Sequence, residues 1–284
     1  MNSNLKTSLL GLLAGLSSVA VFASGTATDT AANYASSWGN SPPNNGSGFG
    51  PWSFNFINAS NPPYVGTYLD LTSYGNPDGA LSPTGPNGYA WGTYANGLDS
   101  FGNPGAFQAT RPFTTGASGS ASLYNQTFSM LLGSKSIGSS QNQSLGVSIG
   151  TAFSLLYSGG GPDNLMLSVD GGAPNGTGVT FANINSGLKI SLSVSGPLNS
   201  PAEVFSLVLS PAAGGPSYAT LNGTFNAAAY NTSSFTVSDN NTSGDAFFNN
   251  PNITAELVPE PSSFALLGMS AFGLLAAHRR SRKA

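Results

Sequence analysis

Strict alternation of apolar and polar residues is the feature that most constrains how this chain can fold. In residues 188–195, Leu-Lys-Ile-Ser-Leu-Ser-Val-Ser, every second side chain is apolar. Because successive side chains of a β-strand point to opposite faces, this pattern predicts a strand with one buried face and one hydrated face. The run from Leu145 to Leu155 and the run from Leu165 to Val169 alternate in the same way and predict further strands.

Many more short segments carry the same signal. They lie at residues 53–57, 64–71, 88–94, 108–113, 124–132, 204–209, 218–225, 235–237 and 253–257. Breaks rich in Gly, Pro and Asn, such as SPTGPNG and DGGAPNGTG, separate the segments; these residues favour turns and stop helices. No helical period is evident between residues 24 and 257. The sequence therefore predicts an all-β body, a single antiparallel β-sandwich of the jelly-roll or concanavalin-like type.

The residues that are missing exclude several kinds of chemistry. The 284-residue chain has no cysteine, which excludes a disulfide framework, a thiolate metal site and a cysteine nucleophile. Its single histidine is His278, near the C-terminus, so the body lacks the base that a serine triad needs. The G-x-S-x-G pattern at residues 146–150 is accordingly interpreted as a strand of small residues and not as a nucleophile elbow.

The N-terminus is typical of an exported protein. Lys6 precedes an apolar region from Leu9 to Phe22, and Val21-Phe22-Ala23 has the small residues of a cleavage site. Residues 1–23 are therefore predicted to be a secretory signal peptide that engages the Sec translocon. Residues 24–51, rich in Gly, Asn and Pro, are predicted to be a flexible segment ahead of the sandwich, which then occupies residues 52–257.

The C-terminus combines three parts in a fixed order. A Pro-Glu-Pro motif comes first, then an apolar run from Phe264 to Ala277, then a basic cluster. As a helix the run would be roughly 21 Å long. This is shorter than the helix of ~20 residues that comfortably spans a membrane. The basic cluster is interpreted as a topology signal that holds the C-terminus on the cytoplasmic side. The motif consists of Val258, Pro259, Glu260 and Pro261, and the cluster of Arg279, Arg280, Arg282 and Lys283.

This arrangement resembles the PEP-CTERM sorting signal of exported proteins in exopolysaccharide-producing Gram-negative bacteria. The resemblance covers residues 258–284 and implies a motif, a short transmembrane helix and a basic tail. It further implies that an exosortase processes the precursor at the inner membrane, which holds it transiently before its release to the cell surface or the medium. A simple C-terminal membrane anchor is the alternative.

Charge is distributed unevenly along the chain. Residues 24–257 contain ten acidic residues and only three basic ones, Arg111, Lys135 and Lys189. Nucleic-acid binding needs a basic surface that releases counterions from phosphates, so a nucleic-acid partner is not expected.

Aromatic residues offer a way to bind sugars. Trp38 and Trp52 lie beside Gly- and Pro-rich loops and are the candidate residues for stacking on sugar rings at the surface. Trp91 is interpreted as a core residue because it lies in the middle of a predicted strand. Residues 90–113 are also similar to a pattern found in secreted bacterial proteins with concanavalin-like sandwiches.

One loop has some of the spacing of a calcium site. Oxygen-bearing residues and a glycine at the sixth position match the start of an EF-hand loop, but the twelfth position is Asn250 and flanking helices are missing. An ordinary polar turn is the preferred interpretation, so no cofactor is expected, with calcium as the alternative. The candidate ligands are Asp239, Asn241, Ser243 and Asp245.

These observations favour an exported, non-enzymatic cell-surface or matrix protein, associated with exopolysaccharide or biofilm and able to bind carbohydrate. One alternative is a ligand-free structural coat protein. The other is a glycoside hydrolase that uses two facing carboxylates. Its candidate acids, most of which lie in turn-like sequence, are Asp70, Asp78, Asp99, Asp163, Asp170 and Glu203.

Overall fold

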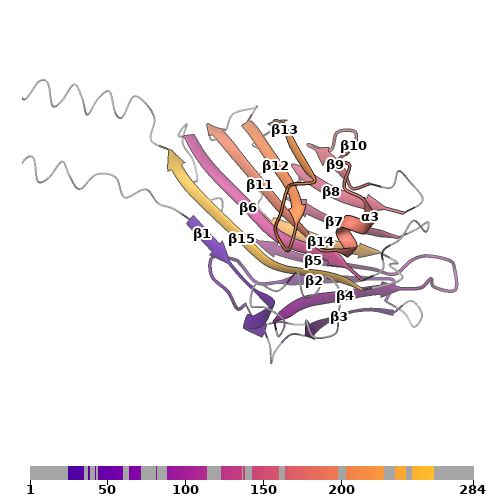
Figure 1. Ribbon diagram of the computed structural model, residues 1–284. Coiled ribbons are helices and arrows are strands. Elements are labelled where there is room, and N and C mark those ends of the chain that lie inside the picture. Colours follow the sequence, from indigo (N-terminus) through magenta and orange to yellow (C-terminus); the bar gives the residue numbers. More distant parts are fainter. Residues whose placement is uncertain are drawn as a thin grey trace, which may run out of the picture.

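The computed structural model describes residues 25–34, 38, 42, 44–59, 64–71, 81, 88–113, 123–135, 137, 143–159, 164–197, 203–226, 234–240 and 245–258. Within these ranges the chain forms two antiparallel sheets, one of eight and one of seven strands (Figure 1). The predicted signal peptide, residues 1–23, and the sorting segment beyond Val258 lie outside the described residues. No helix in the described ranges is long and apolar enough to cross a membrane.

The eight-stranded sheet contains both ends of the described chain. Its order is β13–β12–β11–β6–β15–β4–β3, and β1 pairs with β15 beside this path. The strands are β1 (Gly25–Thr28), β3 (Tyr64–Leu71), β4 (Tyr89–Asn96), β6 (Leu123–Ser134), β11 (Leu188–Pro197), β12 (Glu203–Pro211), β13 (Ala219–Phe225) and β15 (Ala246–Val258).

The seven-stranded sheet has the order β10–β9–β8–β7–β14–β5–β2. Its strands are β2 (Ser53–Ile57), β5 (Ala106–Pro112), β7 (Ser144–Ile149), β8 (Phe153–Ser158), β9 (Met166–Val169), β10 (Asn175–Gly176) and β14 (Ser234–Asn240). The prediction of a single antiparallel sandwich of jelly-roll or concanavalin-like type is thereby confirmed, since two antiparallel sheets enclose one main core.

The alternating sequence forms the core as predicted. In β11, Leu188, Ile190, Leu192 and Val194 are buried, whereas the side chains between them face outward. Each such strand gives one apolar face to the space between the sheets. The outward positions are filled mainly by Ser, Thr and Asn, which hydrate the surface without charge.

Strand β15 joins the two ends of the described chain. Along one edge it pairs with β6; along the other it pairs first with β4 and then with β1, where Gly25 lies opposite Ala255. The register shifts between Asn249 and Asn252, and Asn250 there has a φ of 56°. Such a bulge lets β15 leave β4 and accept β1.

Asn249 fills this bulge with a fully buried side chain. Its Oδ1 accepts hydrogen bonds from the amides of Ala31 (2.9 Å) and Asn250 (2.8 Å). Its Nδ2 donates to the carbonyl oxygens of Leu81 (2.8 Å) and Tyr89 (2.7 Å). One amide group thus satisfies backbone groups from four segments that would otherwise lack partners in the core.

The structure corrects three details of the sequence interpretation. The run from Leu145 to Leu155 is two strands, β7 and β8, because the chain turns at Gly150, whose φ is 55°. A short helix, α3 (Phe181–Asn185), begins where Asn183 Oδ1 accepts the amide of Thr180 (2.9 Å), although no helical period was evident. The second correction also includes a single-turn 3₁₀ helix, η1 (Ala31–Tyr34), which follows β1.

The third correction concerns residues 24–51, predicted to be a flexible segment ahead of the sandwich. Strand β1 belongs to the eight-stranded sheet, and Asp29, Ala31 and Tyr34 are buried. The described residues at the start of this range are therefore part of the sandwich, because backbone pairing and buried side chains tie them to it.

Candidate functional site

The outer face of the eight-stranded sheet is hollowed across β6, β11, β12 and β13. The hollow has a volume of about 780 Å³. We call it the polar groove. Apart from Val204, the outward-facing side chains that line it all carry a hydroxyl or an amide: Asn125, Thr127, Ser193, Ser195, Ser206, Asn222 and Thr224.

Strand register assembles the groove from positions distant in sequence. Thr127 lies opposite Ser193, Ser193 opposite Ser206, and Ser206 opposite Asn222, so four strands contribute one polar side chain each to a single line. The hydroxyls of Thr127 and Ser193 are 3.1 Å apart and form a hydrogen bond. All four side chains face outward because their neighbours along each strand face the core.

The groove carries no formal charge on any of the described residues that line it. Val204, with 52% of its surface exposed, adds an apolar contact beside the serines. Hydroxyls and amides next to exposed carbon are suited to polar, uncharged ligands, since they both donate and accept hydrogen bonds. The sequence shows which residues alternate, but not which strands pair, so sequence reasoning missed this site.

Trp38 and Trp52 lie together in an aromatic cluster at the edge of the core. Their ring centroids are 5.8 Å apart, and the ring of Trp52 lies 5.3 Å from that of Trp91. The expectation that Trp52 is a surface residue is wrong, because only 8% of it is exposed and its Nε1 donates to the hydroxyl of Tyr34 (3.2 Å). Trp38 is half-buried. Sugar binding by these two residues stays a prediction. Trp91 is fully buried, as expected.

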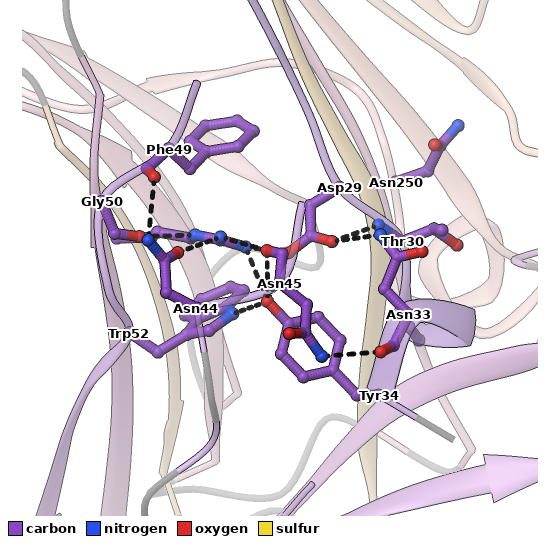
Figure 2. Close-up of polar contacts among 12 residues, drawn as sticks. Asp29, Thr30, Asn33, Tyr34, Asn44, Asn45, Phe49, Gly50, Trp52 and Asn250 are labelled. Carbon is purple, nitrogen blue, oxygen red and sulfur yellow. Dashed lines mark hydrogen bonds and ion pairs between the residues drawn. The ribbon is translucent and has the colours of Figure 1, made fainter. Parts of the chain in front are cut away.

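A buried ion pair between Asp29 and Arg111 lies beside this cluster, and Figure 2 shows the polar contacts around Asp29. The side chains of both residues have no exposed surface. Asp29 also accepts hydrogen bonds from the Tyr34 hydroxyl (2.7 Å) and the Asn33 amide group (2.8 Å). Burial raises the pKa of Tyr34 further above neutral pH than that of an ordinary tyrosine. Its hydroxyl therefore keeps its proton and serves as a donor.

All three nitrogens of the Arg111 guanidinium group donate hydrogen bonds. Nε donates to the carbonyl of Gly50 (2.9 Å), and Nη2 donates to Asn44 Oδ1 (2.8 Å) and the carbonyl of Asn45 (2.7 Å). Its Cζ lies 4.9 Å from the ring centroid of Trp52. Burial lowers the pKa of Arg111 to about 10, so the group remains charged at neutral pH.

These contacts fasten Asp29, Asn44, Asn45 and Gly50 to β5, which makes the network a structural clamp. Sequence reasoning missed it, although a signal was present. In β5 the core-facing positions are Phe107, Ala109 and Arg111, so a charge stands where an apolar residue is expected. A charge at a core position needs a buried partner, and Asp29 is that partner.

The candidate calcium ligands are only partly within the described residues. Asp239 is buried in β14, and its Oδ2 accepts a hydrogen bond from the hydroxyl of Thr93 (3.0 Å). Asp245 precedes β15 and accepts a hydrogen bond from the Tyr68 hydroxyl. Asn241 and Ser243 lie outside the part of the chain that the structure describes. Within that part, no group of three or more His, Cys, Asp or Glu residues is placed to hold a metal ion.

We expect the protein to keep its melting temperature within about one degree when EDTA is added. Hydroxyls of the chain itself already bond Asp239 and Asp245, and neither hydrogen bond needs a cation. Thermal unfolding followed by circular dichroism, with EDTA and with added calcium, checks this. A melting temperature that falls by many degrees in EDTA and recovers with calcium would instead show that a structural calcium ion is bound, with residues 239–245 as its candidate site.

The candidate catalytic acids lie in different settings. Asp99 is in the turn between β4 and β5, where its Oδ1 accepts the amides of Phe101 and Asn103, both at 2.8 Å. The hydrogen bond from the Asn103 side chain is the main cause of the lowered pKa of Asp99. Asp170 accepts the amide of Asn226 (2.8 Å). Asp99 thus holds its own turn, as aspartates in such sequence are expected to do, whereas Asp170 links the turn after β9 to the end of β13.

The remaining acids are placed as follows. Asp70 lies in β3, and Glu203 begins β12 with its side chain buried. Asp78 and Asp163 fall outside the described residues.

Ser148 of the G-x-S-x-G pattern lies in β7, which ends in a tight turn into β8 rather than in a helix.

The C-terminal segment matches a known family model. Residues 257–280 match the PEP-CTERM protein-sorting motif, which confirms the resemblance seen in the sequence. The motif implies an exported precursor that an exosortase processes in the membrane. Val258 is the last residue of β15, so the motif begins within the sandwich; the rest of it, with Pro259, Glu260, Pro261 and the basic cluster, lies outside the described residues.

Solved structures with a similar overall arrangement include plant lectins. Metal-free lectin I-B4 from Griffonia simplicifolia is 11% identical, with a TM-score of 0.40 over 80% of this chain and 98% of the lectin. The lectin from Bauhinia forficata in complex with GalNAc is 11% identical, with a TM-score of 0.35 over 72% and 98%. Lectin II from Ulex europaeus is 9% identical, with a TM-score of 0.38 over 76% and 96%. No curated protein matches the sequence.

Proposed function

We propose that this protein is an exported, non-enzymatic surface or matrix protein whose sandwich binds an uncharged carbohydrate in the polar groove. In this proposal the chain crosses the inner membrane through the Sec translocon, pauses there until its sorting segment is processed, and then associates with exopolysaccharide outside the cell. The PEP-CTERM motif supports the export and sorting steps.

The polar groove is the observation that carries the binding proposal. Its lining offers hydroxyls and amides, which pair with sugar hydroxyls, and an exposed valine, which contacts the carbon face of a sugar ring. An acidic polysaccharide is a poorer fit. The groove holds no cation among its described lining residues, and residues 24–257 have a large excess of acidic residues that repels polyanions.

Binding and turnover are tested on the same sample. The purified protein is applied to an array of neutral and acidic glycans, and each glycan bound is then incubated with the protein and assayed for released reducing sugar. We expect binding to neutral glycans and no release. Release of reducing sugar would favour the hydrolase alternative, and an array without any binding would favour a ligand-free coat protein.

Processing gives a separate expected result. Intact-mass measurement of the secreted form should show a chain that begins near Ser24 and ends close to Pro261, because the signal peptide and the sorting segment are removed during export. The cell-associated precursor of an exosortase-deficient strain is the control and should retain Arg279–Lys283. A secreted form that still carries these basic residues would contradict sorting by cleavage.

A further inference from the structure

The polar groove is part of a longer line of hydrogen-bonding side chains. Thr254 of β15 lies opposite Thr127, so the line runs across five neighbouring strands: β15, β6, β11, β12 and β13. We call it the five-strand row. It consists of Thr254, Thr127, Ser193, Ser206 and Asn222, none of which is buried.

The spacing within this row is set by the sheet. Neighbouring strands lie about 4.8 Å apart, so the row presents one hydroxyl or amide at each step of that length. One sugar unit lengthens an extended hexose chain by a similar distance. A linear glycan laid at right angles to the strands can therefore place each successive sugar unit over the next strand.

The neighbouring positions on β12 favour this direction over one along that strand. On β12 the outward residues on either side of Ser206 are Val204 and Val208, so a polar line along β12 is interrupted at every second position. The five-strand row has no such interruption. Val204 and Val208 instead border the row, where they can contact the carbon faces of sugar rings while the row bonds their hydroxyls.

We propose that the five-strand row binds a linear, uncharged polysaccharide that crosses the strands with one sugar unit per strand. This rests on the proposed function and adds the class of ligand, its direction and the length of chain recognised. The interior of a polymer, and not its end, is the part bound, because at Thr254 the row extends past the residues that line the hollow. No covalent step is involved.

The length of the row gives the first test. Isothermal titration calorimetry with the purified protein uses cello-, manno- and malto-oligosaccharides of one to six units, and hyaluronan oligomers as a polyanion. We expect affinity for at least one neutral series to rise with each unit up to four or five and then to level off, with no binding of hyaluronan. Equal affinity for one unit and for six, or preference for hyaluronan, would overturn the proposal.

A matched pair of variants gives the second test. Ser193→Ile removes the central hydroxyl and puts a larger apolar side chain into the hollow, whereas Ser154→Ile makes the same change on the outer face of the seven-stranded sheet, where Ser154 lies opposite Ser148 and Ser168. Isoleucine suits an exposed strand position, so both variants should fold. We expect Ser193→Ile to weaken binding of the longest neutral oligosaccharide roughly tenfold and Ser154→Ile to leave it unchanged.

The outcomes separate this inference from the proposed function. If no glycan of any kind binds to the purified protein, both are wrong. If a neutral glycan binds but Ser193→Ile and Asn222→Ala have no effect, the protein binds carbohydrate elsewhere and the row is not the site. If Ser154→Ile weakens binding as much as Ser193→Ile does, the assignment to the eight-stranded sheet is overturned. Thermal unfolding of each variant shows that any loss is not a folding defect.

Discussion

Asp29→Ala is expected to lower the free energy of unfolding by about 3–5 kcal/mol, because it leaves the guanidinium of Arg111 buried without a counter-charge. Arg111 has no exposed side-chain surface, so water cannot replace the lost carboxylate. The same change removes the acceptor for the Asn33 amide group and one of the two acceptors of the Tyr34 hydroxyl, which keeps the carbonyl of Asn45. Urea unfolding followed by tryptophan fluorescence measures the loss, since Trp52 lies against Arg111.

A double variant tests whether the unpaired charge is the cause. Asp29→Leu combined with Arg111→Met removes both charges and keeps apolar volume, and we expect it to recover much of the stability lost in the single variant. Equal losses in the single and double variants would show that the hydrogen bonds of Asp29 and Arg111, and not the pairing of their charges, hold the clamp. A single variant as stable as the parent would contradict the clamp itself.

Asn249→Leu is expected to cost about 3 kcal/mol or more, although leucine is similar in size. Four backbone groups lose their partner, namely the amides of Ala31 and Asn250 and the carbonyl oxygens of Leu81 and Tyr89. Each buried polar group left unpaired costs about 1–3 kcal/mol. We expect the loss to concentrate where β15 passes from β4 to β1.

Hydrogen exchange locates this effect. The amides of Ala31 and of β1 should exchange faster in Asn249→Leu than in the parent protein, while amides of β11 and β12 keep their relative protection. Asn55→Leu is the control, since Asn55 is exposed on β2 and its one described side-chain hydrogen bond is long, at 3.4 Å. That variant should stay within about 0.5 kcal/mol of the parent. An equal loss in both variants would contradict the role given to Asn249.

Local strand formation could be read from the sequence because alternation depends only on neighbouring residues. Strands β2 and β3 have the bounds predicted for them, and β11 and β12 differ by a few residues at their ends. The chain was harder to interpret where a single residue changes its course. Gly150 divides one alternating run into two strands, and the capping interaction of Asn183 starts a helix too short to show a period.

The site depends on pairings that no local pattern contains. Ser193, Ser206 and Asn222 lie in three consecutive predicted strands, but Thr127 joins them only through the sheet order. Trp52 was assigned to the surface from the Gly and Pro beside it, and its burial follows from contacts with Tyr34, Trp91 and Arg111. The charged residue on the core face of β5 was the one local sign of that cluster.

The position of β15 determines how the molecule responds to mechanical force. Its C-terminal end runs straight into the sorting segment, and it lies between β6 on one side and β4 and β1 on the other. A pull on a chain tethered through that segment acts along the strand, at right angles to its hydrogen bonds. The bonds to both neighbours are then loaded together in shear and cannot open one at a time. While the precursor is held at the membrane, drag on its body is thus borne by the middle of the sheet and not by an edge strand that could peel away.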